Sequence, residues 1–274
     1  MLQTRSWLPR TQGSVRLGFA RRGDQTALAT LHQAGAMRAR FPRPVDGRVP
    51  EAVLLNTAGG LTGGDRIEVD VALEAGAAAT VTTAAAEKIY RARDADEAAI
   101  RVKVALGTGA WLGWLPQPTI LFDQARLDRA TEVELAGDAS FLGVEILIFG
   151  RAAMGEDVRR GSCRDRWRVR RDGALVFADT LRADGAISDI LDRKATLDGA
   201  RASAMLLYVA PDAAARLGEV RALLQGCASV AGASAWNGLL AVRALAPDGR
   251  TLQRDIAPLA EALSGRPLPR VWQC

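Results

Sequence analysis

Apolar and polar residues alternate along the chain between residue 65 and about residue 185. Residues 67–73 carry isoleucine, valine or leucine at every second position, with glutamate, aspartate or alanine between them. Residues 100–106 repeat this pattern, and a glycine follows each run closely. A period of two is typical of a β-strand with one buried and one solvent-facing side. The pattern therefore predicts a mainly β body without helical segments between its strands.

Further along the chain we expect a tight turn, and then a change from the strand pattern to a pattern that also contains helices. Asp172-Gly173 lies between two strand-like runs, and both residues tolerate positive φ, which predicts a β-hairpin. The last third has the pattern of an α+β segment. Its expected elements are strands at 204–209 and 238–245, a turn at 247–249, and helices at 213–225 and 255–263.

The chain is expected to form one domain over residues 1–274. A mainly β body would occupy about residues 1–200, and a smaller α+β part with about two helices would occupy about residues 201–274. No Pro/Ser-rich linker separates them. At 274 residues and 49% apolar content, the chain can bury a substantial core.

The net charge of +5 raises the question of nucleic-acid binding. All but Lys88, Lys103 and Lys194 of the 36 basic residues are arginines, which indicates a compositional bias more than a phosphate-binding footprint. The basic run at 159–171 favours a solvated or partner-facing strand over a nucleic-acid groove. Aromatic residues make up 5%, too few for base-stacking platforms. We therefore expect no nucleic-acid partner.

The cysteines and the apolar segments predict a cytoplasmic protein that does not bind membranes. Cys163, Cys227 and Cys274 lie far apart without a CxxC pair, which argues against a disulfide framework or a zinc site. No segment has the roughly 18–20 uninterrupted apolar residues of a membrane span. The first residues also lack an apolar run of signal-peptide length.

The glycine-rich stretch NTAGGLTGGDR at 56–66 could be a phosphate loop or a turn. A P-loop needs Lys and Ser or Thr after its last glycine, whereas Asp65 and Arg66 follow here. A dinucleotide-binding loop must lead into a helix, but a strand pattern follows. The sequence therefore favours a turn whose glycines supply positive φ.

Few side chains are available for catalysis or metal binding. His32 is the single histidine, so a His-rich metal site is excluded, and a partly buried structural role is expected for it. Glu145 lies in the apolar run 141–149, where an unpaired charge would cost several kcal/mol. Glu145 is therefore either the partner of a core arginine, such as Arg151, or a functional residue. Asp65, Glu156 and Asp184 have the local pattern of ordinary turn acids.

Five motifs together resemble the UreD family, also called UreH, of urease accessory proteins. They are AGGLTGGDRI at 58–67, VTTAAAEKIYR at 81–91, GWLPQPTILF at 113–122, GVEILIFGRAAMGE at 143–156 and LPRVWQC at 268–274. The resemblance implies a protein that is not an enzyme, with a solenoid-like (β-helical) fold. It also implies binding to the urease apoprotein, recruitment of UreF and the GTPase UreG, contact with UreE through the complex, and nickel insertion into urease. No tightly bound cofactor is implied, only nickel in transit through a water-filled tunnel.

The resemblance also suggests roles for single residues. Asp65, Glu145 and Glu156 become candidates for a transient nickel path, and Glu145 falls where the family often has Asp after Trp. Lys88, Tyr90, Arg91 and Gln117 become candidates for an interface or the tunnel wall.

Two other functions compete with this interpretation. A β-helical carbohydrate-active enzyme would need paired carboxylates about 5–10 Å apart in an open cleft, with aromatic sugar platforms. A basic nucleic-acid binder would show a steep salt dependence.

Overall fold

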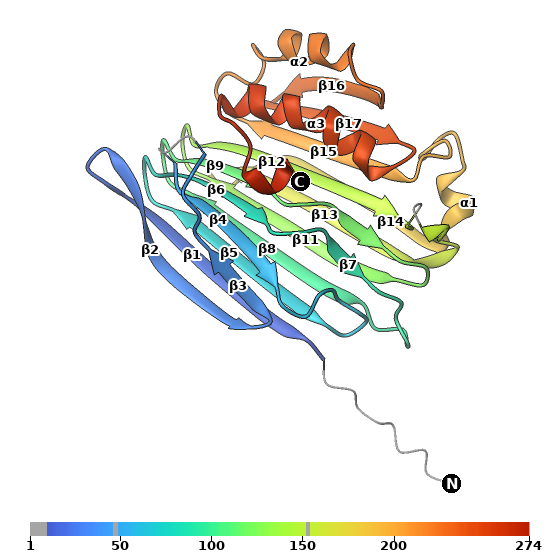
Figure 1. Ribbon diagram of the computed structural model, residues 1–274. Helices are drawn as coiled ribbons and strands as arrows, with labels where there is room; N and C mark the ends of the chain where they lie inside the picture. Colours follow the sequence, from blue (N-terminus) through green and yellow to red (C-terminus); the bar gives the residue numbers. More distant parts are fainter. Residues whose placement is uncertain (1–9, 46–48, 152–153, 274) are drawn as a thin grey trace.

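The computed structural model describes residues 10–45, 49–151 and 154–273. In this part of the chain, two β-sheets pack face to face around the main hydrophobic core, and the helices of the C-terminal part lie on the outer side of one sheet (Figure 1). The predicted mainly β, solenoid-like fold with layered sheets is confirmed.

One sheet has seven strands among the described residues, in the order β14-β13-β11-β8-β5-β1-β2. The strand bounds are β1 Gln12–Arg22, β2 Gln25–Gly35, β5 Arg66–Leu73, β8 Ala98–Leu106, β11 Arg126–Leu135, β13 Arg160–Arg171 and β14 Ala174–Ala186.

The other sheet has ten strands within the same described ranges, in the order β16-β17-β15-β12-β9-β6-β4-β3, with β10 beside β12 and β7 beside β10. The bounds are β3 Met37–Arg40, β4 Glu51–Asn56, β6 Ala78–Thr83, β7 Glu87–Ile89, β9 Trp111–Leu115, β10 Thr119–Leu121, β12 Ser140–Phe149, β15 Ala202–Val209, β16 Val230–Trp236 and β17 Leu239–Ala246.

The middle of the chain visits the two sheets in turn, which makes the solenoid. β4, β6, β9 and β12 form parallel neighbours in the ten-stranded sheet. β5, β8, β11 and β13 alternate with them and are parallel in the seven-stranded sheet. Parallel pairing places inward-facing residues of neighbouring strands side by side, so that Val69 pairs with Val102 and Val102 with Thr131. Each inward position therefore belongs to a rung that crosses the sheet.

Antiparallel strands close both ends of the solenoid. β1 pairs with β2, and β13 pairs with β14 through the predicted hairpin, in which Asp172 has φ 49° and Gly173 φ 79°. The C-terminal strands β15, β17 and β16 continue the ten-stranded sheet beyond β12. The C-terminal part is thus bound to the solenoid by strand pairing.

Three α-helices lie within the described ranges, together with a 3-10 turn at Arg270–Trp272. They are α1 Ile187–Leu191, α2 Leu217–Leu224 and α3 Gly249–Ser264. α3 covers the outer face of the ten-stranded sheet and buries Leu252, Ile256 and Leu259 against β12, β15 and β17 (Figure 1).

The helix boundaries correct the sequence expectations. α2 begins only at Leu217, because residues 212–216 form turns. α3 begins at Gly249 and not at residue 255, so the expected turn at 247–249 is the start of a helix. Asp248 caps this helix by accepting a hydrogen bond of 2.8 Å from the Thr251 backbone N–H.

The expected partial burial of His32 is wrong. His32 is exposed on β2, which forms the edge of its sheet and is largely exposed along its length. Cys163 is a buried free thiol and Cys227 a half-buried one, whereas Cys274 lies outside the described residues. The reducing cytoplasm inferred from the cysteines stays a prediction.

Across the described ranges, none of the helices combines the length and the apolar character that a membrane crossing requires.

Replacing the capping residue of α3 tests the corrected helix start. Asp248→Ala removes the acceptor for the Thr251 N–H, and we expect a loss of about 1 kcal/mol in the free energy of unfolding. Asp24→Ala, at a fully exposed aspartate, is the matched control and should change it by less than about 0.5 kcal/mol. Urea denaturation measures both, and equal effects would place the helix start elsewhere.

Candidate functional site: a buried cluster around Arg129

One rung of the seven-stranded sheet changes from apolar to charged as it crosses the sheet. Ile67 pairs with Ile100, Ile100 with Arg129, and Arg129 with Asp165. On each strand these positions lie an even number of residues from the core residues, so their side chains point to the same side, towards the other sheet. Arg129 and Asp165 are each only 5% exposed. A guanidinium and a carboxylate thus lie in the interior between the sheets.

Arg129 connects strands from both sheets. Its Nε and Nη2 donate to the two carboxylate oxygens of Asp165 at 2.9 and 2.8 Å. Its Nη1 donates to Thr119 Oγ1 at 2.8 Å. The same Nη1 lies 2.7 Å from Glu145 Oε1. The two form an ion pair whose angles are not those of a hydrogen bond. We call Arg129, Asp165, Glu145 and Thr119 the Arg129 cluster.

The cluster identifies the partner of Glu145. The core arginine is Arg129, and the suggested partner Arg151 is wrong, because Arg151 pairs with Glu156 at 2.6 Å. Burial raises the pKa of Glu145 to about 8, with Arg129 opposing this shift and the Asp165 charge adding to it. Burial thus favours the protonated form of Glu145, whereas the Arg129 charge favours the ionised form.

A second carboxyl with a raised pKa lies between this cluster and the glycine-rich turn. Glu87 on β7 is the register partner of Thr119 on β10. Asn56, at the end of β4, donates to its two carboxylate oxygens at 3.0 and 3.3 Å. Burial raises the pKa of Glu87 to about 7, against the opposing effects of the Asn56 hydrogen bond and the Arg129 charge. Half-buried Glu87 thus extends the polar interior towards the turn.

Two further polar groups face the same interior. Thr131 Oγ1 and Trp167 Nε1 are buried without a hydrogen-bond partner among the described residues, and the two residues pair in register. Buried polar groups of this kind are usually satisfied by ordered water. The interior next to the Arg129 cluster therefore contains polar groups whose hydrogen-bonding capacity is not used within the described residues.

Asp65 serves the glycine-rich turn. Its Oδ1 accepts from the Thr11 N–H at 2.7 Å and its Oδ2 from the Thr62 N–H at 2.8 Å. Gly59 and Gly64 have φ of 77° and 86°, as the expected turn requires. Both carboxylate oxygens thus brace backbone, and the proposed contact of Asp65 with nickel stays a prediction.

Tyr90 and Glu156 lie in loops outside the Arg129 cluster. The Tyr90 hydroxyl donates to the Gly59 carbonyl at 3.1 Å, and its ring packs edge-on against Phe122 at 4.9 Å. The Arg151 guanidinium lies 4.3 Å from the centre of the Phe122 ring and pairs with Glu156. Loops distant in sequence are thus joined by aromatic and ionic contacts.

Lys88 and Arg91 flank Ile89 and Tyr90 and are exposed. We call the exposed residues Lys88, Tyr90 and Arg91 the Tyr90 surface. They suit an interface, which stays a prediction.

Gln117 ties the WLPQ motif to the end of the chain. Its Nε2 donates to the Val271 carbonyl at 3.1 Å, and its Oε1 accepts from Gln253 at 3.0 Å. Trp272 Nε1 likewise donates to the Leu115 carbonyl at 2.9 Å. These contacts give Gln117 a structural role, while a role in a tunnel or interface stays a prediction.

The three acids of the expected nickel path are not brought together. Asp65, Glu145 and Glu156 share no hydrogen-bond or ion-pair partner. In the described ranges, no group of three or more His, Cys, Asp or Glu side chains is placed to hold a metal ion. Sequence reasoning missed Glu87, Arg129 and Asp165. The available signal was a charged residue at a strand position where the alternation calls for an apolar one, namely Arg129 in LDRATEVEL and Asp165 in CRDRWRV.

Comparison with known proteins assigns the chain to a family. The family model described as "UreD urease accessory protein" matches residues 11–273. A urease accessory protein UreD from Azorhizobium caulinodans is 50% identical over 263 residues, which cover 96% of each chain. One from Xanthobacter autotrophicus is 51% identical, covering 96% of this chain and 90% of the relative. The chain belongs to the UreD family.

In this UreD family member, removing Arg129 should destabilise the fold strongly. Arg129→Met leaves Asp165 buried without its partner, and we expect a loss of about 3–5 kcal/mol in the free energy of unfolding. Arg16→Met, at an exposed arginine 3.5 Å from Asp70, should cost less than about 1 kcal/mol. Urea denaturation at neutral pH compares the two, and equal losses would contradict a central role for Arg129.

Because the pKa of Glu145 is raised on folding, its contribution to the free energy of unfolding should fall as pH rises. Its pKa rises from 4.5 to about 8 on folding, so the unfolded chain loses the proton first as pH increases. Stability supplied by this proton is complete below pH 4.5 and is lost as pH rises through about 8. Glu145→Gln should reduce this loss by on the order of a few kcal/mol, measured by urea denaturation across the window.

Exposed Glu68 provides the control for this pH dependence. Glu68→Gln should keep the wild-type dependence. A Glu145→Gln variant that loses stability between weakly acidic and weakly alkaline pH as steeply as the Glu68→Gln control would show that Glu145 titrates normally.

Proposed function

We propose that this protein acts in urease maturation as a scaffold without catalytic activity, and that nickel(II) passes through its interior by way of Glu87 and Glu145. Membership in a family of urease accessory proteins supports the role in urease maturation. One observation supports the passage of nickel. Two carboxyl groups with raised pKa values, Glu87 and Glu145, lead from the glycine-rich turn to the Arg129 cluster.

The chemistry of these carboxyl groups suits transfer more than storage. Carboxylate oxygens hold a divalent transition metal more weakly than histidine or thiolate groups do. Glu87 and Glu145 have pKa values of about 7 and about 8, so an arriving cation competes with a proton at each. Arg129 adds a fixed positive charge that opposes tight cation binding. A site with these properties takes up and releases a metal ion readily.

The proposed partners are the urease apoprotein, UreF, the GTPase UreG and, through the complex, UreE. The exposed Tyr90 surface supports a protein interface at the loops. The glycine-rich turn has Asp65 and Arg66 where a phosphate loop has Lys and Ser or Thr, so we assign GTP binding to the partner UreG.

The carbohydrate-active alternative has little support from the Arg129 cluster. Glu145 and Asp165 are each 5% exposed and are held by the same guanidinium. A glycosidase pair must reach the sugar from an open cleft. Burial between two sheets does not provide that access.

Nickel insertion into urease tests the proposed path separately from complex assembly. Co-expression with urease, UreF and UreG gives urease whose nickel content is measured by elemental analysis, while co-purification measures assembly. Glu87→Gln/Glu145→Gln should lower nickel content about tenfold and leave co-purification intact. Glu68→Gln is the control and should retain full nickel content.

Asp65→Asn distinguishes a turn brace from a nickel ligand. Loss of assembly and nickel together would assign Asp65 to the turn, whereas selective loss of nickel would place it on the path. Full nickel content with the Glu87→Gln/Glu145→Gln variant would refute the path through the interior. Normal nickel content in a strain that lacks this protein would refute the maturation role as well.

A further inference from the structure

The outward side of the seven-stranded sheet carries a concentration of arginines opposite to the Arg129 cluster. Along β13, Cys163, Asp165, Trp167 and Val169 point into the core, so the alternate residues point outward. These outward residues include Arg164, Arg166, Arg168 and Arg170. β8, which lies on the other side of β11 in the same sheet, adds Arg101 and Lys103. β13 thus carries the inward acid Asp165 and four outward arginines.

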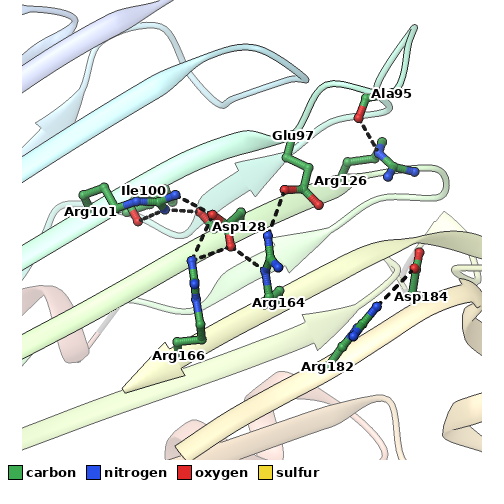
Figure 2. A network of polar contacts seen from close by, with 10 residues as sticks. All are labelled: Ala95, Glu97, Ile100, Arg101, Arg126, Asp128, Arg164, Arg166, Arg182 and Asp184. Atoms are coloured by element: carbon green, nitrogen blue, oxygen red, sulfur yellow. Dashed lines mark hydrogen bonds and ion pairs between the residues drawn. The ribbon is translucent and has the colours of Figure 1, made fainter. Parts of the chain in front are cut away.

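Asp128 organises the arginines at the centre of this side (Figure 2). Arg164 Nε and Arg166 Nη2 donate to its Oδ1 at 2.8 and 2.9 Å, and Arg101 Nη2 donates to its Oδ2. The Asp128 side chain is 8% exposed, so it lies beneath these arginines. Glu97 also pairs with Arg164 at 3.6 Å, so three guanidinium groups and two carboxylates leave one positive charge. We call the outward residues of β8, β11 and β13 around Asp128 the Asp128 face.

A pocket of about 240 Å³ opens beside this network. Its charged lining consists of Arg101, Lys103, Arg166, Arg168 and a single acid, Glu132. The side chains of Lys103 and Arg168 form no ion pair or hydrogen bond within the described ranges, although Glu132 lies between them in register. Arg166 Nε is buried without a partner there as well. The pocket therefore presents cationic groups whose bonding capacity is unused.

We propose that the Asp128 face binds an acidic, extended segment of a partner protein, with one of its carboxylates bound in the pocket by the side chains of Lys103 and Arg168. Guanidinium groups pair with carboxylates through two parallel hydrogen bonds, which favours this ligand. Outward residues on a strand recur about every 6.6–6.8 Å, as do the side chains on one face of an extended segment. An extended acidic partner can therefore meet several arginines of β13 at once.

The same face is poorly suited to nucleic acid. The outward positions of β8, β11 and β13, all within the described ranges, carry no aromatic side chain on which a base could stack. The proposal concerns a different side of the sheet from the nickel path and does not depend on it.

Binding of a labelled oligoglutamate peptide of about ten residues to the full-length protein tests the proposal. Fluorescence anisotropy should show binding that weakens between about 50 and about 300 mM salt. Lys103→Gln/Arg168→Gln should weaken it about tenfold, as the loss of two exposed charge pairs predicts. The control Arg22→Gln/Lys194→Gln removes the same charges from exposed positions elsewhere and should bind as the wild type does.

Three results would overturn the proposal. One is the absence of peptide binding, and another is an equal loss in both double variants, which would indicate a general charge effect. The third is displacement of the peptide by inorganic phosphate or single-stranded DNA at equal charge concentration, which would indicate an oxyanion or nucleic-acid site. Circular dichroism of both double variants confirms that each is folded.

Discussion

The buried ion pairs of Arg129 constrain the interior of the structure. Removing a guanidinium and two carboxyl groups from water is costly unless each finds a partner, and here Arg129 supplies the partner for both acids. Its contacts join β11 and β13 of one sheet to β10 and β12 of the other. The parallel register that brings Arg129 beside Asp165 must therefore be correct for the fold to be stable.

Several strands were predictable from local sequence, whereas the cluster was not. The alternation in residues 67–73 and 100–106 gives β5 and β8 directly, and Asp172-Gly173 gives the β13–β14 hairpin. Arg129 and Asp165, in contrast, are 36 residues apart and meet only through the pairing of β11 with β13. A charged residue at a core-facing position of a strand requires a partner, but the pairing of strands from successive turns of the solenoid determines which residue that partner is.

The errors have similar physical causes. His32 is exposed because β2 forms a sheet edge, and edge position depends on the order of strands and not on local pattern. The start of α3 was misplaced because the sequence Pro247-Asp248-Gly249 suits both a turn and a capped helix start. Packing of the helix against β12 and β15 decides between them.

β11 and β13 carry Arg129 and Asp165 on their inward side and the basic Asp128 face on their outward side. The interior is central to the proposed function, and anomalous X-ray diffraction at the nickel absorption edge tests it most directly. In crystals of the full-length protein soaked with nickel(II), we predict a peak between the two sheets beside Glu87 or Glu145. Nickel peaks confined to the molecular surface would contradict passage through the interior.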